Sequence, residues 1–458
     1  MLEDKLKRYA QSGIYPFHMP GHKRNFSGCL PYELDVTEID GFDNLHEPDG
    51  CLREIEHRAE RLYNSKRAFL LVNGATAGIL ASVRAITHRG DTVITARNCH
   101  KSVYNAIELC GLNPVYILPD TIDDHNFFGA VSPGRVKELL LGNPNARLVI
   151  ITSPTYEGIC SDVKKISEIC RDHGAKLLVD EAHGAHFPFC ADFPQTALEC
   201  GADVSVVSLH KTLPAPTQTA LLLTNDISLE KPLQNQLSVF QTSSPSYLLM
   251  CGIEKCLDFA ENNSFKEYNK MLDGFYRESL RLKKLSLLFN CYGASPVDKG
   301  KLVILTDKTA LTGRELADML REEFKLETEM SGADYVIAMT SVCDTKDGFD
   351  RLLSALLEID GRIEYSDKEL KFIIPTTLPQ KVFDPCDAVL LKHGDPALIR
   401  SDGVVSLDYI YAYPPGIPFV VPGELISREM LEAFSSLSKL GLKISNYERY
   451  SRILKSLP

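Results

Sequence analysis

The 458-residue sequence has no tryptophan, no cysteine pair in CxxC spacing, no apolar run of membrane-spanning length and no excess of basic residues. The missing tryptophan decides nothing. Because there is no long apolar run and no apolar signal core near the N-terminus, the sequence indicates neither a membrane protein nor a secreted one. The formal net charge of −11 argues against a nucleic-acid partner, which requires a basic face.

The thirteen cysteines are scattered along the chain. A chain of this length builds a core large enough to fold without disulfides, so we expect reduced, buried thiols in a cytoplasmic protein. Hydrophobic residues make up 44% of the sequence and charged residues 24%, which is ordinary for a soluble globular protein.

From about residue 51 onward, short apolar runs rich in β-branched residues alternate with helical patterns. This is typical of a mostly parallel sheet that is buried on both faces. Only five residues separate Pro214 from the run 220–224, too few for a crossover helix, so we expect that strand to be antiparallel. The expected strands are 68–72, 91–95, 115–118, 147–152, 176–180, 203–207 and 220–224.

The sequence divides into three regions. Residues 1–50 begin with a short amphipathic pattern over 1–12 and continue as a loop-like arm, which we expect to lie at a dimer interface. A large domain spans 51–290 and ends in one long helix, or two joined helices, from 244. A smaller α/β domain covers 291–458, with a possible subdivision near 365–380, and includes an expected helix over 427–440.

Four loops at the ends of the predicted strands hold reactive residues, and such loops converge at the carboxyl edge of an open α/β sheet. Gly74, Ala75 and Thr76 open a helix, whose free N–H groups and dipole favour an anion. His100 stands at another helix start, where it is either an acid–base group, a flat contact for a planar ligand, or an ordinary capping residue.

The third loop follows Asp180, a carboxylate at the end of an apolar strand that requires a cationic or donor partner. His183 and His186 lie nearby, but no third ligand stands at a fixed spacing, so no metal site is predicted. The fourth loop carries Ser208, His210 and Lys211. Pro214 and Pro216 exclude a helix directly after Lys211, which we expect on a strand-end loop, placed as an amine nucleophile.

Together these loops offer an anion cradle, a flat contact surface, a buried carboxylate and an amine. The combination matches the phosphate, ring face, pyridinium nitrogen and aldehyde of pyridoxal 5'-phosphate. We therefore predict this cofactor.

The same residues carry a resemblance to a known family. The ordered motifs Asn-Cys-His-Lys-Ser (98–102), Ser-Pro-Thr-Tyr-Glu-Gly (153–158), Asp-Glu-Ala-His-Gly-Ala-His (180–186) and Ser-Leu-His-Lys-Thr-Leu-Pro (208–214) resemble the class-I Orn/Lys/Arg decarboxylases. So do Pro-Gly-His at 20–22 and the two Pro-Gly segments within 413–424. The resemblance covers nearly the whole chain.

The resemblance implies an aspartate-aminotransferase-like fold, that of fold-type I pyridoxal enzymes. Such a protein has a three-layer α/β/α large domain with a mostly parallel seven-stranded sheet, a smaller α/β C-terminal domain, and at least a dimeric assembly. The chain is similar to the short form of the family. Because few residues precede 13, we do not expect the N-terminal receiver-like domain of the long forms or their decameric assembly.

Carried over by position, Lys211 is implied to be the Schiff-base lysine and Asp180 the partner of the pyridinium nitrogen. His100 would stack on the cofactor ring and His210 would take part in proton transfer. The implied cofactor-binding residues are Gly74, Ala75, Thr76, His100, Asp180, Ala182, His183, Ser208, His210 and Lys211. Ala75 departs from the Ser or Thr of many relatives, which puts the strength of phosphate binding in doubt.

Substrate-side residues are implied less directly, at His18, His22, Asp43 and Glu424. The implied reaction removes the α-carboxylate of lysine, arginine or ornithine, as in polyamine biosynthesis. An aminotransferase remains an alternative, with Arg362 or Arg400 available for a substrate carboxylate. A catalytically silent binding protein of the same fold is a further alternative.

Overall fold

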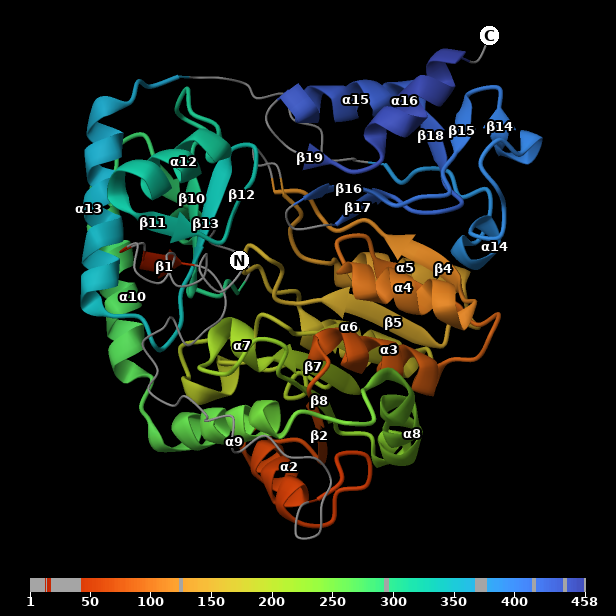
Figure 1. Ribbon diagram of the computed structural model, residues 1–458, viewed down its shortest axis with the longest axis horizontal. Helices are drawn as coiled ribbons and strands as arrows, with labels where there is room; N and C mark the ends of the chain where they lie inside the picture. The colour runs from red at the N-terminus through yellow and green to blue at the C-terminus, as the bar shows by residue number, and fades with distance from the viewer. Residues whose placement is uncertain are drawn as a thin grey trace.

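The computed structural model describes residues 13, 15–17, 43–122, 127–291, 296–366, 377–413, 417–439 and 443–456. A central sheet lies between layers of helices, and two smaller units adjoin it, one around β10 and β13 and one around β14 to β19 (Figure 1). The expected helix over 1–12 lies outside the described residues. No described helix combines the length and the apolarity needed to cross a membrane.

The central sheet has seven strands in the order β2-β8-β7-β6-β5-β3-β4. Nearly all of their residues are buried because helices cover both faces. The strands are β2 (Arg67–Leu71), β3 (Thr92–Ala96), β4 (Asn113–Ile117), β5 (Leu148–Thr152), β6 (Lys176–Asp180), β7 (Val204–Ser208) and β8 (Ala220–Thr224).

The direction in which the chain crosses the sheet fixes the two helical layers. It moves one way from β2 through β3 to β4, and then returns through β5 and β6 to β7. Because crossovers between parallel strands are right-handed, α3 (Gly74–Ile86) and α4 (Lys101–Cys110) cover one face, and α5 (Pro133–Gly142) and α6 (Val163–Asp172) cover the other. The observed fold is therefore the predicted mostly parallel α/β sheet.

Strand β8 is antiparallel to both β7 and β2, as the short connection predicted. Ser208 pairs with Ala220 at the closed end of the β7–β8 hairpin. Between them, residues Leu209–Thr212 form a single helical turn, α7. The expectation that Lys211 lies on an irregular loop is wrong, because a short turn fits before the prolines even though a longer helix does not.

The helical region after the sheet consists of separate helices rather than one long helix. They are α8 (Glu230–Phe240), α9 (Tyr247–Asn262) and α10 (Lys266–Ser279). Asn263 is extended between the last two, with φ −117° and ψ 144°, which ends the first of them. Earlier in the chain lies α2 (Cys51–Leu62). The carboxylate of Asp43 caps this helix by accepting hydrogen bonds from backbone N–H groups at its start.

The smaller unit that follows has a four-stranded sheet in the order β12-β13-β10-β9. Tyr15–Phe17, as β1, pairs in parallel with β11 of this unit, so the described part of the N-terminal arm packs on its own chain. The elements are β9 (Ser286–Leu287), α11 (Leu288–Cys291), β10 (Lys301–Leu305), α12 (Gly313–Phe324), β11 (Leu326–Thr328), β12 (Met330–Ser331), β13 (Tyr335–Met339) and α13 (Lys346–Arg362).

The last unit has its own hydrophobic core, formed by side chains between Leu398 and Tyr450 and separate from the main core. The subdivision near 365–380 stays a prediction. Its helix α15 agrees with the expected one, whereas α16 was not expected. The elements are α14 (Pro385–Ala388), β14 (Ile399–Arg400), β15 (Gly403–Val405), β16 (Ile410–Tyr413), β17 (Pro418–Val420), β18 (Leu425–Ser427), α15 (Arg428–Lys439), β19 (Lys443–Ile444) and α16 (Tyr447–Ser456).

Candidate active site

A cavity of about 280 Å³ lies at the carboxyl ends of the parallel strands. Strand-end loops far apart in the sequence meet here, as expected at the edge of an open α/β sheet. All the residues that the sequence assigned to the cofactor line it, namely Gly74, Ala75, Thr76, His100, Asp180, Ala182, His183, Ser208, His210 and Lys211.

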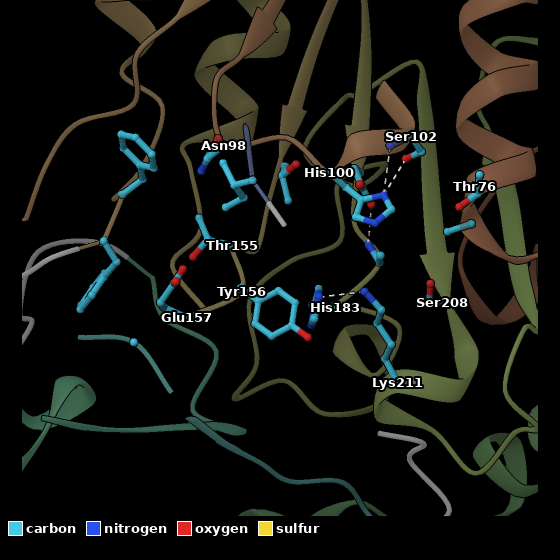
Figure 2. Close-up of a pocket in the computed structure, with 18 of the residues that line it drawn as sticks. Thr76, Asn98, His100, Ser102, Thr155, Tyr156, Glu157, His183, Ser208 and Lys211 are labelled. Carbon is cyan, nitrogen blue, oxygen red and sulfur yellow. Dashed lines mark hydrogen bonds between the residues drawn. The ribbon is translucent and has the colours of Figure 1, made fainter. Parts of the chain in front are cut away.

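Lys211 points from α7 toward His183, and its Nζ lies 2.9 Å from Nε2 of that histidine (Figure 2). Burial lowers the pKa of Lys211, although the nearby charges of Asp180 and Glu329 oppose the shift. Because the lower pKa favours the neutral amine, Lys211 is a suitable nucleophile.

The carboxylate of Asp180 closes the sheet side of the cavity. It stands at the last position of β6 and is 4% exposed. One of its oxygens accepts a hydrogen bond of 3.2 Å from the N–H of Ala182. A buried carboxylate in a ligand cavity is suited to a cationic ring N–H, since the pair would offset the cost of burying either charge alone.

His100 begins helix α4 as its N-cap. Its Nδ1 accepts the N–H of Ser102 at 3.3 Å and lies 2.9 Å from the Ser102 hydroxyl oxygen (Figure 2). Burial lowers the pKa of His100, and Asp180 opposes the shift. The capping bond leaves the proton of the neutral ring on Nε2. His100 is therefore a capping residue that also lines the cavity, and its role as an acid–base group or as a flat contact for a ligand stays a prediction.

Helix α3 begins at the opposite end of the cavity. Gly74 has φ +74°, a conformation that favours glycine, and donates its N–H to the carbonyl of Gln218 at 2.8 Å. The hydroxyl residues Thr76 and Ser208 both line the cavity near this helix start (Figure 2). A helix N-terminus with two hydroxyl groups is the donor set that a phosphate requires.

His210 and His183 contribute neutral rings. The Nδ1 of His210 lies 3.0 Å from the carbonyl oxygen of Thr219, and burial lowers the pKa of His210. Burial, followed by the charges of Lys211 and Lys301, lowers the pKa of His183 far below its usual range. His183 is therefore a neutral imidazole at physiological pH.

Residues 155–157 and the smaller unit form a further wall of the cavity that the sequence did not predict. The ring of Tyr156 lies 4.6 Å from that of His183, and its hydroxyl is 2.6 Å from Glu329. Glu157 accepts a 3.0 Å bond from the Tyr335 hydroxyl, and burial raises its pKa. The motif 153–158 was recognised, but no sequence signal indicated that its tyrosine and glutamate face the cavity.

Two of the four substrate-side residues, Asp43 and Glu424, are among the described residues, and both lie away from the cavity. Asp43 accepts N–H bonds from the start of α2, and Glu424 forms a buried ion pair with Arg97; neither lines the cavity. His18 and His22 lie outside the described residues. Asp43 and Glu424 therefore have no contact with the described cavity, and the roles of His18 and His22 stay predictions.

The arginines considered for an aminotransferase also lie elsewhere. Arg362 pairs with Glu323 at 2.5 Å and is 41% exposed, and Arg400 donates to the carbonyls of Ala397 and Ile399. Neither lines the cavity, so the geometry does not favour the aminotransferase alternative.

Comparison with known proteins agrees with this site. The sequence model of the Orn/Lys/Arg decarboxylase major domain matches residues 2–300. The uncharacterized protein YaaO of Bacillus subtilis (strain 168) is 32% identical over 464 residues, which cover 94% of this chain and 93% of that protein. The arginine decarboxylase of the same organism is 29% identical and is covered over 94% of its length by 97% of this chain.

Solved structures show the same fold. The constitutive lysine decarboxylase of Escherichia coli has a TM-score of 0.76 at 18% identity, over 97% of this chain and 79% of that one. Alanine–glyoxylate aminotransferase of Nostoc sp. has a TM-score of 0.55 at 14% identity, over 67% of this chain and 86% of that one. Both alignments fit the predicted fold-type I architecture.

The residues at the cavity also fit the cofactor of this fold. A helix start with two nearby hydroxyl groups, a buried carboxylate, flat neutral rings and an amine of lowered pKa surround one space. This donor set suits pyridoxal 5'-phosphate, and in an amino-acid decarboxylase the cofactor supplies the electron-withdrawing chemistry. From the family match and this site, the chain belongs to the Orn/Lys/Arg decarboxylase family, whose cofactor is pyridoxal 5'-phosphate.

Proposed function

We propose that this protein decarboxylates arginine, releasing CO₂ and agmatine. The observation that carries the proposal is the nearly full-length match to a Bacillus subtilis arginine decarboxylase, in which both chains are covered over more than nine-tenths of their length. The inducible lysine decarboxylase of Escherichia coli is 22% identical and is covered over 78% of its length. Lysine is therefore the second candidate substrate, ahead of ornithine.

We assign the residues of the cavity to distinct tasks. Lys211 would bond pyridoxal phosphate covalently, and Asp180 would hold the proton on its ring nitrogen. His100 would lie against the ring on one side. When bound there, pyridoxal phosphate withdraws the electron pair that remains on the substrate Cα after CO₂ leaves. The hydroxyls of Thr76 and Ser208, together with the start of α3, would bind the phosphate.

The chain's own groups must then return a proton to Cα. Lys211 Nζ and a ring nitrogen of His210 are the two candidates, since both belong to residues that line the cavity. The apolar and aromatic wall, including Phe127, Phe128 and Phe419, would limit competing proton transfer by excluding water.

Glu157 is our candidate for recognition of the substrate's cationic head group. It is buried, faces the cavity, and lies across Tyr156 from Lys211 (Figure 2). Burial raises the pKa of Glu157, which a guanidinium or ammonium close to its carboxylate would lower again. A planar guanidinium matches a carboxylate with two parallel hydrogen bonds, which favours arginine.

A single assay tests the proposed substrate. The purified chain is supplied with pyridoxal phosphate and, separately, with arginine, lysine and ornithine, and both CO₂ and amine products are measured. We expect the highest kcat/KM with arginine. A higher kcat/KM with lysine or ornithine would contradict the substrate assignment, and 2-oxo-acid formation without CO₂ would favour an aminotransferase.

Glu157→Gln examines the head-group site. We expect KM for arginine to rise about tenfold or more, because an ion pair with the substrate is lost, with a smaller change in kcat. The control is Glu138→Gln, which removes a carboxylate that is 66% exposed and pairs with Arg135 on α5. If KM does not change in Glu157→Gln, Glu157 does not bind the head group.

We also propose a homodimer or dimer-based oligomer and a cytoplasmic role in polyamine synthesis. The family resemblance supports these proposals. Sedimentation of the purified chain tests the assembly, and a purely monomeric species with full activity would contradict it.

A further inference from the structure

Lys301 is a buried lysine that lies outside the cavity and has no role in the function proposed above. It is the first residue of β10 in the smaller unit and is 1% exposed. Its Nζ lies 2.6 Å from Nδ1 of His183 and 3.0 Å from the sulfur of Met339, its partner across the β10–β13 pair. Because the other ring nitrogen of His183 contacts Lys211, one imidazole joins two lysines.

The path of the Lys301 side chain is built into the fold. It passes Gly158, where φ is +91° and a Cβ would stand 2.8 Å from Lys301 Cγ. Any other residue at 158 would be strained by the backbone conformation and would collide with this side chain. The glycine therefore serves the close approach of the two units at this point.

Two carboxylates, those of Asp298 and Glu157, lie close enough to Lys301 to balance a positive charge on it. Burial would raise the pKa of Asp298, but His186 and Lys301 hold it below its usual range. Burial also raises the pKa of Glu157, and the Lys301 charge opposes that shift. The other charged or titratable groups that act on this cluster are Asp180, Glu329, His100 and His210.

The hydrogen-bond partners then determine where the protons of Lys301, His183 and Lys211 lie. A protonated lysine has three donors and no acceptor, so Lys301 can only donate to Nδ1 of His183. The neutral ring must in that case carry its own proton on Nε2, which makes Nε2 a donor toward Lys211. Lys211 can accept that bond only with the lone pair of an uncharged amine.

We propose that Lys301 is a positioning residue: through His183 it holds Lys211 as a neutral amine, ready to bond the cofactor. The inference rests on the proposed role of Lys211 and is independent of the choice of substrate. It explains why a lysine from the smaller unit is buried against a histidine of the large domain. It also gives His183 a task beyond contact with the cofactor ring.

The test measures the proton affinity of Lys211 in the cofactor-free, full-length chain. Brief reductive methylation with formaldehyde and cyanoborohydride across a pH series, followed by peptide mass spectrometry, gives the apparent pKa of Lys211. In Lys301→Met we expect that pKa to rise by about one unit, which slows labelling of Lys211 about tenfold at neutral pH. Rates of pyridoxal phosphate binding should show the same displacement along the pH axis.

A double-mutant cycle distinguishes an effect of Lys301 that passes through His183 from a direct effect of its charge on Lys211. His183→Phe should raise the Lys211 pKa by itself, and adding Lys301→Met should then change nothing further. Lys299→Met is the matched control, because it removes a neighbouring buried lysine that pairs instead with Asp273 at 2.9 Å. We expect an unchanged Lys211 pKa in that variant.

Several outcomes would overturn the inference: an unchanged Lys211 pKa in either Lys301→Met or His183→Phe, additive effects in the double variant, or a proton on Nδ1 of His183 in ¹⁵N NMR spectra of the unmutated chain. The NMR measurement does not depend on whether Lys301→Met folds. Borohydride reduction of the cofactor-loaded chain identifies the bonded lysine separately, so a wrong role for Lys211 is distinguishable from a wrong role for Lys301.

Discussion

Two buried clusters hold basic side chains in this molecule in different ways. Arg97 follows β3, and its guanidinium makes two bonds, of 3.0 and 2.5 Å, to the carboxylate of Glu424 in the last unit. Lys211 instead contacts a neutral imidazole, His183, which also contacts Lys301. Both clusters join the large domain to a smaller unit, but only the second borders the cavity.

The contrast shows how burial serves stability in one place and reactivity in another. Arg97 has its charge balanced, and Glu424 accepts a further 2.9 Å bond from the N–H of Val421. Burial raises the pKa of Glu424, and the charge and hydrogen bonds of Arg97 oppose that shift. Around Lys211 the same burial favours loss of a proton, because its hydrogen-bond partner is not a carboxylate.

Lys211→Ala should show the largest difference between the two clusters, because it should affect activity rather than stability. We expect decarboxylation to fall about a thousandfold or more, since the covalent bond to the cofactor is lost, while the free energy of unfolding changes little. The visible absorption band of the bound cofactor and CO₂ release are the measurements. A variant that keeps both would show that another lysine bonds the cofactor.

Glu424→Ala should have the opposite profile. Removing one partner of a buried pair leaves Arg97 uncompensated, and we expect the free energy of unfolding to fall by about 3–5 kcal/mol. Urea denaturation measures the change. The exposed pair Arg135–Glu138 provides the control, with an expected change within about 1 kcal/mol for Glu138→Gln. Equal losses in both variants would contradict the distinction between a buried and an exposed pair.

Glu181 extends the comparison to a buried acid without a basic partner among its described contacts. Its oxygens accept bonds from the N–H of Ala197 and the hydroxyl of Ser205, and burial raises its pKa to about 8. Because the folded pKa exceeds the ordinary value of 4.5, the group contributes stability at low pH that is lost as pH rises toward about 8. In Glu181→Gln, the free energy of unfolding should fall by about 1–3 kcal/mol less over this pH range than it does in the unmutated chain.

Denaturation of both proteins at intervals between about pH 5 and pH 8 measures the effect. The slope of stability against pH should become shallower in Glu181→Gln. If the two slopes are the same, Glu181 titrates as an ordinary carboxyl.

Thr76→Val probes the phosphate end of the cavity and should have the smallest effect. Loss of one hydroxyl donor to a charged group should weaken pyridoxal phosphate binding about five- to tenfold. Thr312→Val serves as the control, because this residue caps α12 in the smaller unit and should alter stability without altering cofactor affinity. Unchanged cofactor affinity in Thr76→Val would place the phosphate elsewhere.

The sequence predicted those cavity residues of the large domain whose positions follow from local patterns, although it missed residues 155–157. A β-branched run identifies each strand, and the residue after the run must lie at the carboxyl edge of the sheet. Asp180 and Lys211 could be assigned in this way. The helical turn α7 was missed because four residues are too few for a periodic pattern.

Contacts between units were beyond the sequence. Lys301 and His183 are 118 positions apart, and nothing near residue 301 indicates a histidine partner. Glu424 was expected near the substrate from the family resemblance, but its partner Arg97 lies 327 positions earlier. Periodicity reports which face of an element is buried and is silent on which distant side chain meets it.

The pairing of β1 with β11 has a consequence for the order in which the protein is made. Tyr15 and its partner Asp344 are 329 positions apart, so a ribosome must add all the residues between them before this early strand can find its place. Phe17 is fully buried in the folded protein and cannot reach that buried position until then. The nascent chain therefore carries an unpartnered apolar segment through most of its synthesis, a period in which chaperones have a binding site that the mature enzyme no longer offers.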